Sequence, residues 1–111
     1  MTLTEKLRKR RFYPVTIGEE TVHVRRLTVD EAERVDGIEN GLIKAFFMVG
    51  CCLLDESGAP AYSRNDDESD IQFAERVKAE GKDIPADTLA DITAGIWKAT
   101  KVPSPGTTSK N

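Results

Sequence analysis

The stretch Gly41–Leu54 constrains the fold of this chain most strongly, because it is the most apolar run and Lys44 is its only charged residue. A helix that is apolar over so much of its circumference packs on several sides. The run is shorter than the roughly 20 apolar residues that span a bilayer. We therefore predict a central core helix that the other elements cover. Apolar residues at spacings of three and four form two stripes along it. One stripe is Leu42, Phe46, Val49 and Leu53, and the other is Ile43, Phe47, Gly50 and Leu54.

Length and composition narrow the class of protein. A chain of 111 residues predicts one domain. Its 39% hydrophobic and 32% charged residues are typical of a soluble globular protein. The net charge of −3 argues against a general nucleic-acid binder, because domains that bind phosphate are usually basic. We expect no membrane anchor, since no run is long enough, and no secretory signal, since residues 4–11 are highly charged.

The chain divides into three parts by composition. Residues 1–11 form a basic N-terminal arm whose positive charges lie between Lys6 and Arg11. This arm is either a solvated terminus or a docking arm for an acidic partner surface. Residues 12–102 carry the apolar periodicity and predict a single helical domain. Residues 103–111 have no such periodicity, and we expect a disordered C-terminal tail.

The first elements of the domain resemble a β-hairpin. Phe12–Ile17 and Thr21–Leu27 are β-prone, and a turn at residues 18–20 separates them. Pro14 restricts its strand to the edge of a sheet, because proline has no amide to donate. His23 is the only histidine, and we expect it exposed on the second strand.

Helix signals fill the rest of the domain, which gives a mainly α (α+β) fold, a small helical domain with an N-terminal β-hairpin. Thr28 and Glu31 have the spacing of a capping box. The acidic run from 65 to 70 favours a helix start, and Pro85 suits the first turn of the last helix. The residues expected to face inward on these helices are Val29, Ala32 and Val35, then Ile71, Ala74 and Val77 with Phe73 beside them, then Leu89, Ile92, Ile96 and Ala99.

The sequence offers no catalytic, cofactor or metal motif. It lacks a phosphate loop, a nucleophile elbow and a zinc motif, so we expect a protein that is not an enzyme and has no cofactor. The acidic run lacks the glycine of a calcium loop. Cys51 and Cys52 are neighbours on the core helix, and we interpret them as small buried hydrophobes.

The order of features along the chain resembles the small tail assembly chaperones of long-tailed bacteriophages. The features are a strand ending in Val24–Thr28, an acidic capped helix, an apolar helix running into Leu53–Gly58, the motif Ala61-Tyr62-Ser63, an acidic patch, and a last helix opened by Ile84–Asp87. The resemblance covers about Val15 to Val102. The segment 65–82 is longer than the pattern of that family, and the basic arm is unusual in it.

This resemblance implies a non-enzymatic protein that binds the phage tape-measure protein while tail-tube subunits polymerise around it. It implies work in the host cytoplasm and absence from the mature virion. In that family a ribosomal frameshift often appends a domain that recruits the tail-tube protein. The closing dipeptide Lys110-Asn111 fits a slippery codon run if Lys110 is AAA, although Lys-Asn is also a common dipeptide.

Four residues are candidates for partner binding: Arg25, Arg26, Phe47 and Trp97. Trp97 lies beside the apolar stripe of the last helix and covers either the core edge or a partner pocket. The arginines also support the alternative hypothesis, a small nucleic-acid-associated regulatory protein that uses the basic N-terminal arm. The net negative charge and the lack of a recognition helix oppose that alternative.

Overall fold

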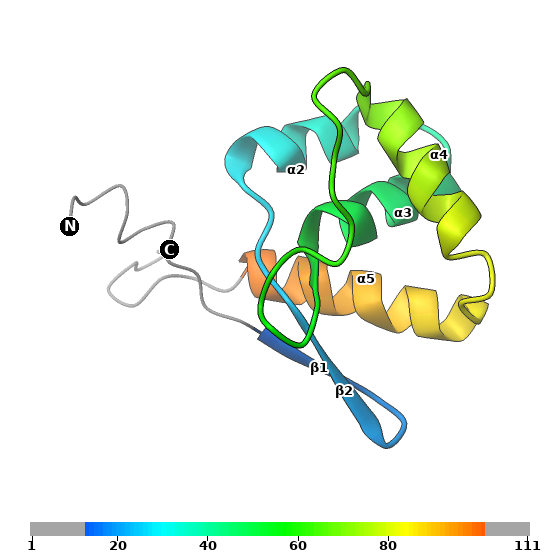
Figure 1. Cartoon of the computed structure of the whole chain (residues 1–111). Helices are drawn as coiled ribbons and strands as arrows, with labels where there is room; N and C mark the ends of the chain where they lie inside the picture. The colour runs from blue at the N-terminus through cyan, green and yellow to red at the C-terminus, as the bar shows by residue number, and fades with distance from the viewer. Residues whose placement is uncertain (1–12, 102–111) are drawn as a thin grey trace, which may run out of the picture.

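A computed structural model describes residues 13–101, which form an α+β domain (Figure 1). The order of elements is β1 (Tyr13–Ile17), β2 (Glu20–Val24), α2 (Val29–Asp36), α3 (Gly41–Cys52), β3 (Leu53–Leu54), α4 (Asp70–Glu80) and α5 (Ala86–Lys101). This confirms a small helical domain with an N-terminal β-hairpin. The predictions for the basic arm and for the C-terminal tail lie outside the described residues.

The hairpin forms a three-stranded antiparallel sheet with a short strand that the sequence did not predict. The strand order is β1-β2-β3, so β1 is an edge strand, as Pro14 predicted. Gly18 has a φ of 62° in the turn, a conformation that favours glycine. Leu53 and Leu54 pair with β2 instead of continuing the core helix. The prediction of a helix through Leu54 was therefore wrong by two residues, because β2 offers its free edge to the chain that leaves α3.

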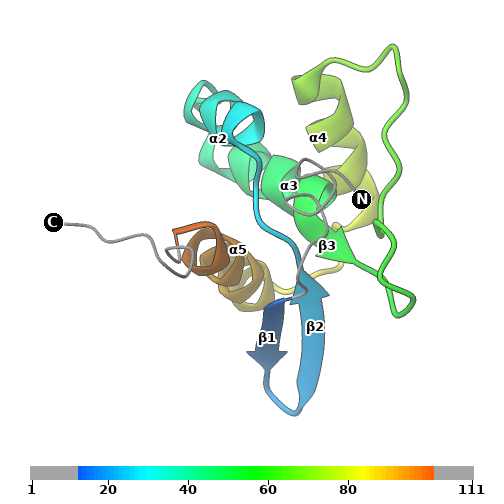
Figure 2. The ribbon, with the colours of Figure 1, turned by 90° about the vertical axis from the view of Figure 1, so that its left-hand side faces the viewer.

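Helix α3 lies at the centre of the domain, as its two apolar stripes predicted. It packs against α2, α4 and α5 (Figures 1 and 2). Asn40 caps its start by accepting hydrogen bonds from the amides of Leu42 and Ile43. Leu42 was expected inside, but its side chain is 47% exposed. It belongs to the first turn of α3 and lines a small open hollow together with Lys78 of α4 and Leu89 of α5, so these helices do not close over it.

Local caps set the other helix boundaries. Thr28 and Glu31 form the predicted capping box at α2, and Gly37 is the C-cap of that helix. Ser69 and Gln72 form a second capping box at α4. The structure therefore places only Asp70 of the acidic run inside the helix, since Ser69 is the N-cap of α4 and the residues before it lie outside the helix.

Two residues expected to face inward are exposed instead. Val29 is 80% exposed and Ile71 is 44% exposed. Both lie in the first turn of a short helix, since α2 begins at Val29 and α4 begins at Asp70. Apolar spacing alone does not show which turn of a helix reaches the core. The other inward predictions hold, with Val35, Phe73, Ala74 and Val77 buried, the α5 stripe of Leu89, Ile92, Ile96 and Ala99 buried, and Ala32 partly buried.

Candidate partner-binding groove

An open groove of about 790 Å³ lies between the turn end of the hairpin and the start of α5. We call it the groove. Tyr62 from the segment before α4 and the α4–α5 turn complete its walls. Figures 1 and 2 show the hairpin extending past the helices at this end. Its apolar lining consists of Ile17, Val22, Tyr62, Ile84, Pro85 and Ile92.

The register of the hairpin explains why the groove has an apolar floor. Val15 lies opposite Val22, so Val15, Ile17, Val22 and Val24 share one face of the sheet. Val15 and Val24 are buried in the core. Ile17 and Val22 continue the same face toward the turn but are only half-buried. The groove is thus the end of the core-facing surface that α5 does not fully cover.

The opposite wall is held in place by Gly81. The amide of Ile84 donates to the Gly81 carbonyl at 3.0 Å, which closes the turn between α4 and α5. A side chain at Gly81 would come within 3.3 Å of the Phe46 ring and 3.0 Å of Ile84 Cδ1. The absence of a side chain lets the turn lie close to the core. Ile84 consequently packs on the core and lines the groove at once.

Charge on the lining of the groove is of one sign. We call Glu19, Glu20, Glu80 and Asp83 the acidic rim, and within residues 13–101 no Lys, Arg or His side chain lines the groove. Burial raises the pKa of the Tyr62 hydroxyl, and the negative charge of Glu80 raises it further. The groove therefore combines an apolar floor with a negative potential.

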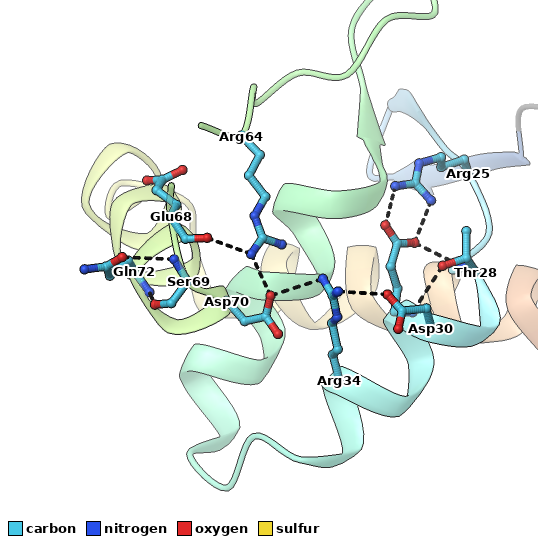
Figure 3. A network of polar contacts seen from close by, with 10 residues as sticks. Arg25, Thr28, Asp30, Arg34, Arg64, Glu68, Ser69, Asp70 and Gln72 are labelled. Carbon is cyan, nitrogen blue, oxygen red and sulfur yellow. Dashed lines mark hydrogen bonds and ion pairs between the residues drawn. The ribbon is translucent and has the colours of Figure 1, made fainter. Parts of the chain in front are cut away.

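A different pattern of charge holds α2, α4 and the segment between α3 and α4 together. Arg34 contacts Asp30 at 3.1 Å and Asp70 at 3.4 Å, and Arg64 contacts Asp70 at 2.7 Å (Figure 3). Asp70 thus joins α2 to the segment that precedes α4. In this network each carboxylate has an arginine partner, so it is a structural clamp rather than a free charged surface.

Arg25 belongs to the same side of the molecule. Its guanidinium donates two hydrogen bonds of 2.8 Å to the Glu31 carboxylate, which also accepts from the Thr28 amide at 2.9 Å (Figure 3). Burial acts to raise the pKa of Glu31, but the hydrogen bonds from Arg25 and Thr28 outweigh it and hold that pKa below the usual value. The pair fixes the end of β2 to the start of α2.

The four residues predicted to bind a partner are not brought together, and none lines the groove. Arg25 is bound to Glu31, and Arg26 lies over the Tyr13 ring at 5.2 Å. The Nε atom of Arg26 is buried and has no hydrogen-bond partner in the part of the chain that the structure describes. Both guanidinium groups are thus engaged within the protein. Trp97 is partly buried against the core, in agreement with the core-edge alternative.

The prediction that Phe47 binds a partner was wrong. Its side chain is fully buried and meets the Phe73 ring edge-on, with the ring centroids 6.5 Å apart. A side chain inside the core has no surface to offer a partner, so Phe47 is a packing residue. The second apolar stripe of α3 faces α4 rather than a partner, because α4 covers it.

The remaining reactive groups are unremarkable in position. His23 is exposed on β2, as expected. Cys51 and Cys52 are buried and unbonded, and burial raises the pKa of Cys51 to about 12 and that of Cys52 further still. Thiols of this kind are inert at neutral pH. Between Tyr13 and Lys101, no group of three or more His, Cys, Asp or Glu side chains is placed to hold a metal ion.

The sequence did not reveal the groove. Its lining comes from the hairpin, from Tyr62 and from the α4–α5 turn, which lie far apart along the chain. The one local signal was Glu19-Glu20, which follows Ile17 after a single glycine and places two acids at the end of an apolar strand face. That signal marks a hairpin turn as readily as a binding site.

Comparisons with protein-family models, with curated protein sequences and with solved structures found no match for this chain. None of the helices in the described range is both long and apolar enough to cross a membrane.

Proposed function

We propose that this chain is a phage tail assembly chaperone that binds the tape-measure protein and assists tail-tube polymerisation without catalysing a reaction. The observation that carries the proposal is the groove, with its apolar floor and acidic rim. The order of sequence features between Val15 and Val102 supports it, because that order resembles the small tail assembly chaperones.

The physical basis is the protection of exposed apolar surface. A tape-measure protein is a long helical chain whose apolar face has no partner until the tube forms around it. Contiguous apolar patches larger than a few hundred Å² promote association. A small domain that covers such a face segment by segment keeps the chain in solution, and helix-in-groove docking is a common way to do so.

The proposal includes place and partners. The protein acts in the host cytoplasm and is left out of the mature virion. A product extended by frameshifting near Lys110-Asn111 recruits the tail-tube protein, while the shorter product covers the tape-measure protein. A flexible connection between two such modules lets both engage one assembly.

Co-expression with the tape-measure protein of the same phage tests the proposal. We expect a larger soluble fraction of the tape-measure protein and a complex on a sizing column. Thr88→Lys places a cation and extra bulk in the groove and is expected to abolish the effect, whereas Ala90→Lys, exposed on the same helix, is expected to retain it. Unchanged solubility together with no complex would refute the chaperone. Salt-sensitive DNA binding that depends on residues 1–11 would favour the regulatory alternative.

A further inference from the structure

We infer that the groove takes a basic amphipathic helix, one whose apolar stripe is flanked by Lys and Arg. The inference rests on the proposed function, since it names the chemistry of the partner segment that this groove binds.

The rim acids contrast with the four carboxylates outside the rim that arginines hold within residues 13–101. Asp30, Glu31, Glu68 and Asp70 each form an ion pair with an arginine. Among the rim acids within residues 13–101, only Glu80 forms one, a 3.3 Å contact with Arg76. Arg76 also binds Glu68 at 2.7 Å, so a single guanidinium is shared between two carboxylates. Other exposed acids within residues 13–101, such as Glu33 and Glu75, also form no ion pair, but they do not line the groove.

This arrangement places four carboxylates around one apolar opening. Gathering like charges costs free energy, which a bound cationic segment would recover. At Asp70, by contrast, the chain supplies its own cations, because Arg34 and Arg64 both contact that carboxylate. At the groove, the matching cations are supplied by the partner. The four rim side chains are exposed. Exposed charges contribute mainly to the association rate and to the choice of partner.

The floor provides the affinity. Ile17, Val22 and Ile84 are partly buried apolar residues that pack on the core and line the groove. The volume of about 790 Å³ lies within the roughly 300–1,000 Å³ of typical ligand sites. It therefore accommodates apolar side chains from one face of a helix, while the flanking positions of that helix lie over the acidic rim.

The lining favours a helix over an added strand. A peptide that adds to a sheet pairs with the backbone of an edge strand. Here the hairpin contributes side chains of the face that holds Ile17 and Val22, so the groove opens on a face of the sheet and not along the backbone of the edge strand β1. A partner in the groove is therefore recognised through side-chain contacts and not through backbone hydrogen bonds to a strand. Apolar residues at spacings of three and four are the pattern that fits such a surface.

The experiment uses the full chain and labelled peptides of about 20 residues, long enough to form a helix. All peptides share one leucine stripe, and their remaining positions are Lys and Arg, Gln, or Glu. Fluorescence anisotropy measures binding. We expect the basic peptide to bind about tenfold or more tighter than the Gln peptide at low salt, and the Glu peptide to bind weakest. Raising the salt to about 0.5 M should remove most of the difference.

Matched variants locate the binding. Neutralising the rim should remove the preference for the basic peptide but keep the Gln peptide bound. Neutralising as many exposed acids elsewhere should keep the preference, which makes that variant the control. The rim variant is Glu19→Gln/Glu20→Gln/Glu80→Gln/Asp83→Asn, and the control is Glu33→Gln/Asp36→Asn/Glu39→Gln/Glu75→Gln.

Three results would overturn the inference. The first is equal binding of the basic and Glu peptides, or equal loss in the rim and control variants. The second is tighter binding of a peptide that copies residues 1–12, which would assign the groove to the chain's own basic arm. The third is a dimer on a sizing column that Thr88→Lys dissociates, which would assign it to a second copy.

Failure here is distinguishable from failure of the proposed function. If the basic peptide binds through the rim but the tape-measure protein is not solubilised, the groove chemistry stands and the chaperone role falls. If the tape-measure protein is solubilised by the rim variant as well as by the unmodified chain, the chaperone role stands and the basic-helix inference falls.

Discussion

Substitution of Gly50 by valine tests how α3 and α4 pack. Gly50 lies in the buried middle of α3. A Cβ atom there would come within 2.8 Å of the Phe73 ring and within 2.9 Å of Val77 Cγ2, both on α4. These separations are shorter than van der Waals contact, so α4 must move or a side chain must leave its rotamer.

The Phe73 ring has little freedom to move. It is 2% exposed, and Phe47 meets it edge-on. Arg64 and Arg76 lie over the ring at 5.4 and 5.5 Å. Overpacking of a closed core site costs about 1–3 kcal/mol. Valine recovers only a few tenths of a kcal/mol over glycine in helix propensity. We therefore expect Gly50→Val to lower the free energy of unfolding by about 2 kcal/mol.

The assay is urea and thermal denaturation of Gly50→Val beside Gly41→Val. Gly41 is in the same helix, but a Cβ there meets nothing within 4 Å, so this control isolates the helix-propensity effect. We expect the melting temperature of Gly50→Val to fall by roughly 10 °C and that of Gly41→Val to change little. If the two variants have the same stability, Gly50 is not a close-packing position and the described α3–α4 contact is wrong.

Phe46→Ala should lower the free energy of unfolding by roughly 3–5 kcal/mol, because the ring is buried, and denaturant titration would expose an error if the loss is below about 1 kcal/mol. The hydrogen bonds from Arg76 lower the pKa of Glu68 from 4.5 to about 2, so the stability from this pair is present above pH 4.5 and is lost as the pH falls toward 2. Over that pH range the free energy of unfolding should fall less for Glu68→Gln than for the control Asp67→Asn, and equal falls would contradict the pairing of Glu68 with Arg76. Deletion of residues 1–11 should leave the melting temperature nearly unchanged, because the arm holds few large apolar residues; a drop of ten degrees or more, roughly 1–3 kcal/mol, would mean that it packs on the core.

Local chemistry in the sequence determined the boundaries of most elements. The capping box of Thr28 and Glu31 formed as predicted, because its hydrogen bonds join residues only three apart. Pro14 indicated the edge strand, since a missing amide is a property of the residue itself. The apolar run from Gly41 identified the central helix, because an apolar surface on all sides can be stable only inside a domain.

Only the tertiary structure decided which surfaces remain open. Phe47 and Leu42 lie in the same apolar helix, yet α4 buries the first and leaves the second 47% exposed. Leu53 and Leu54 continue a helical pattern, but the free edge of β2 draws them into a strand. The groove arises because the hairpin, Tyr62 and the α4–α5 turn meet in space. Such a meeting depends on contacts between residues far apart in the chain, which no local pattern specifies.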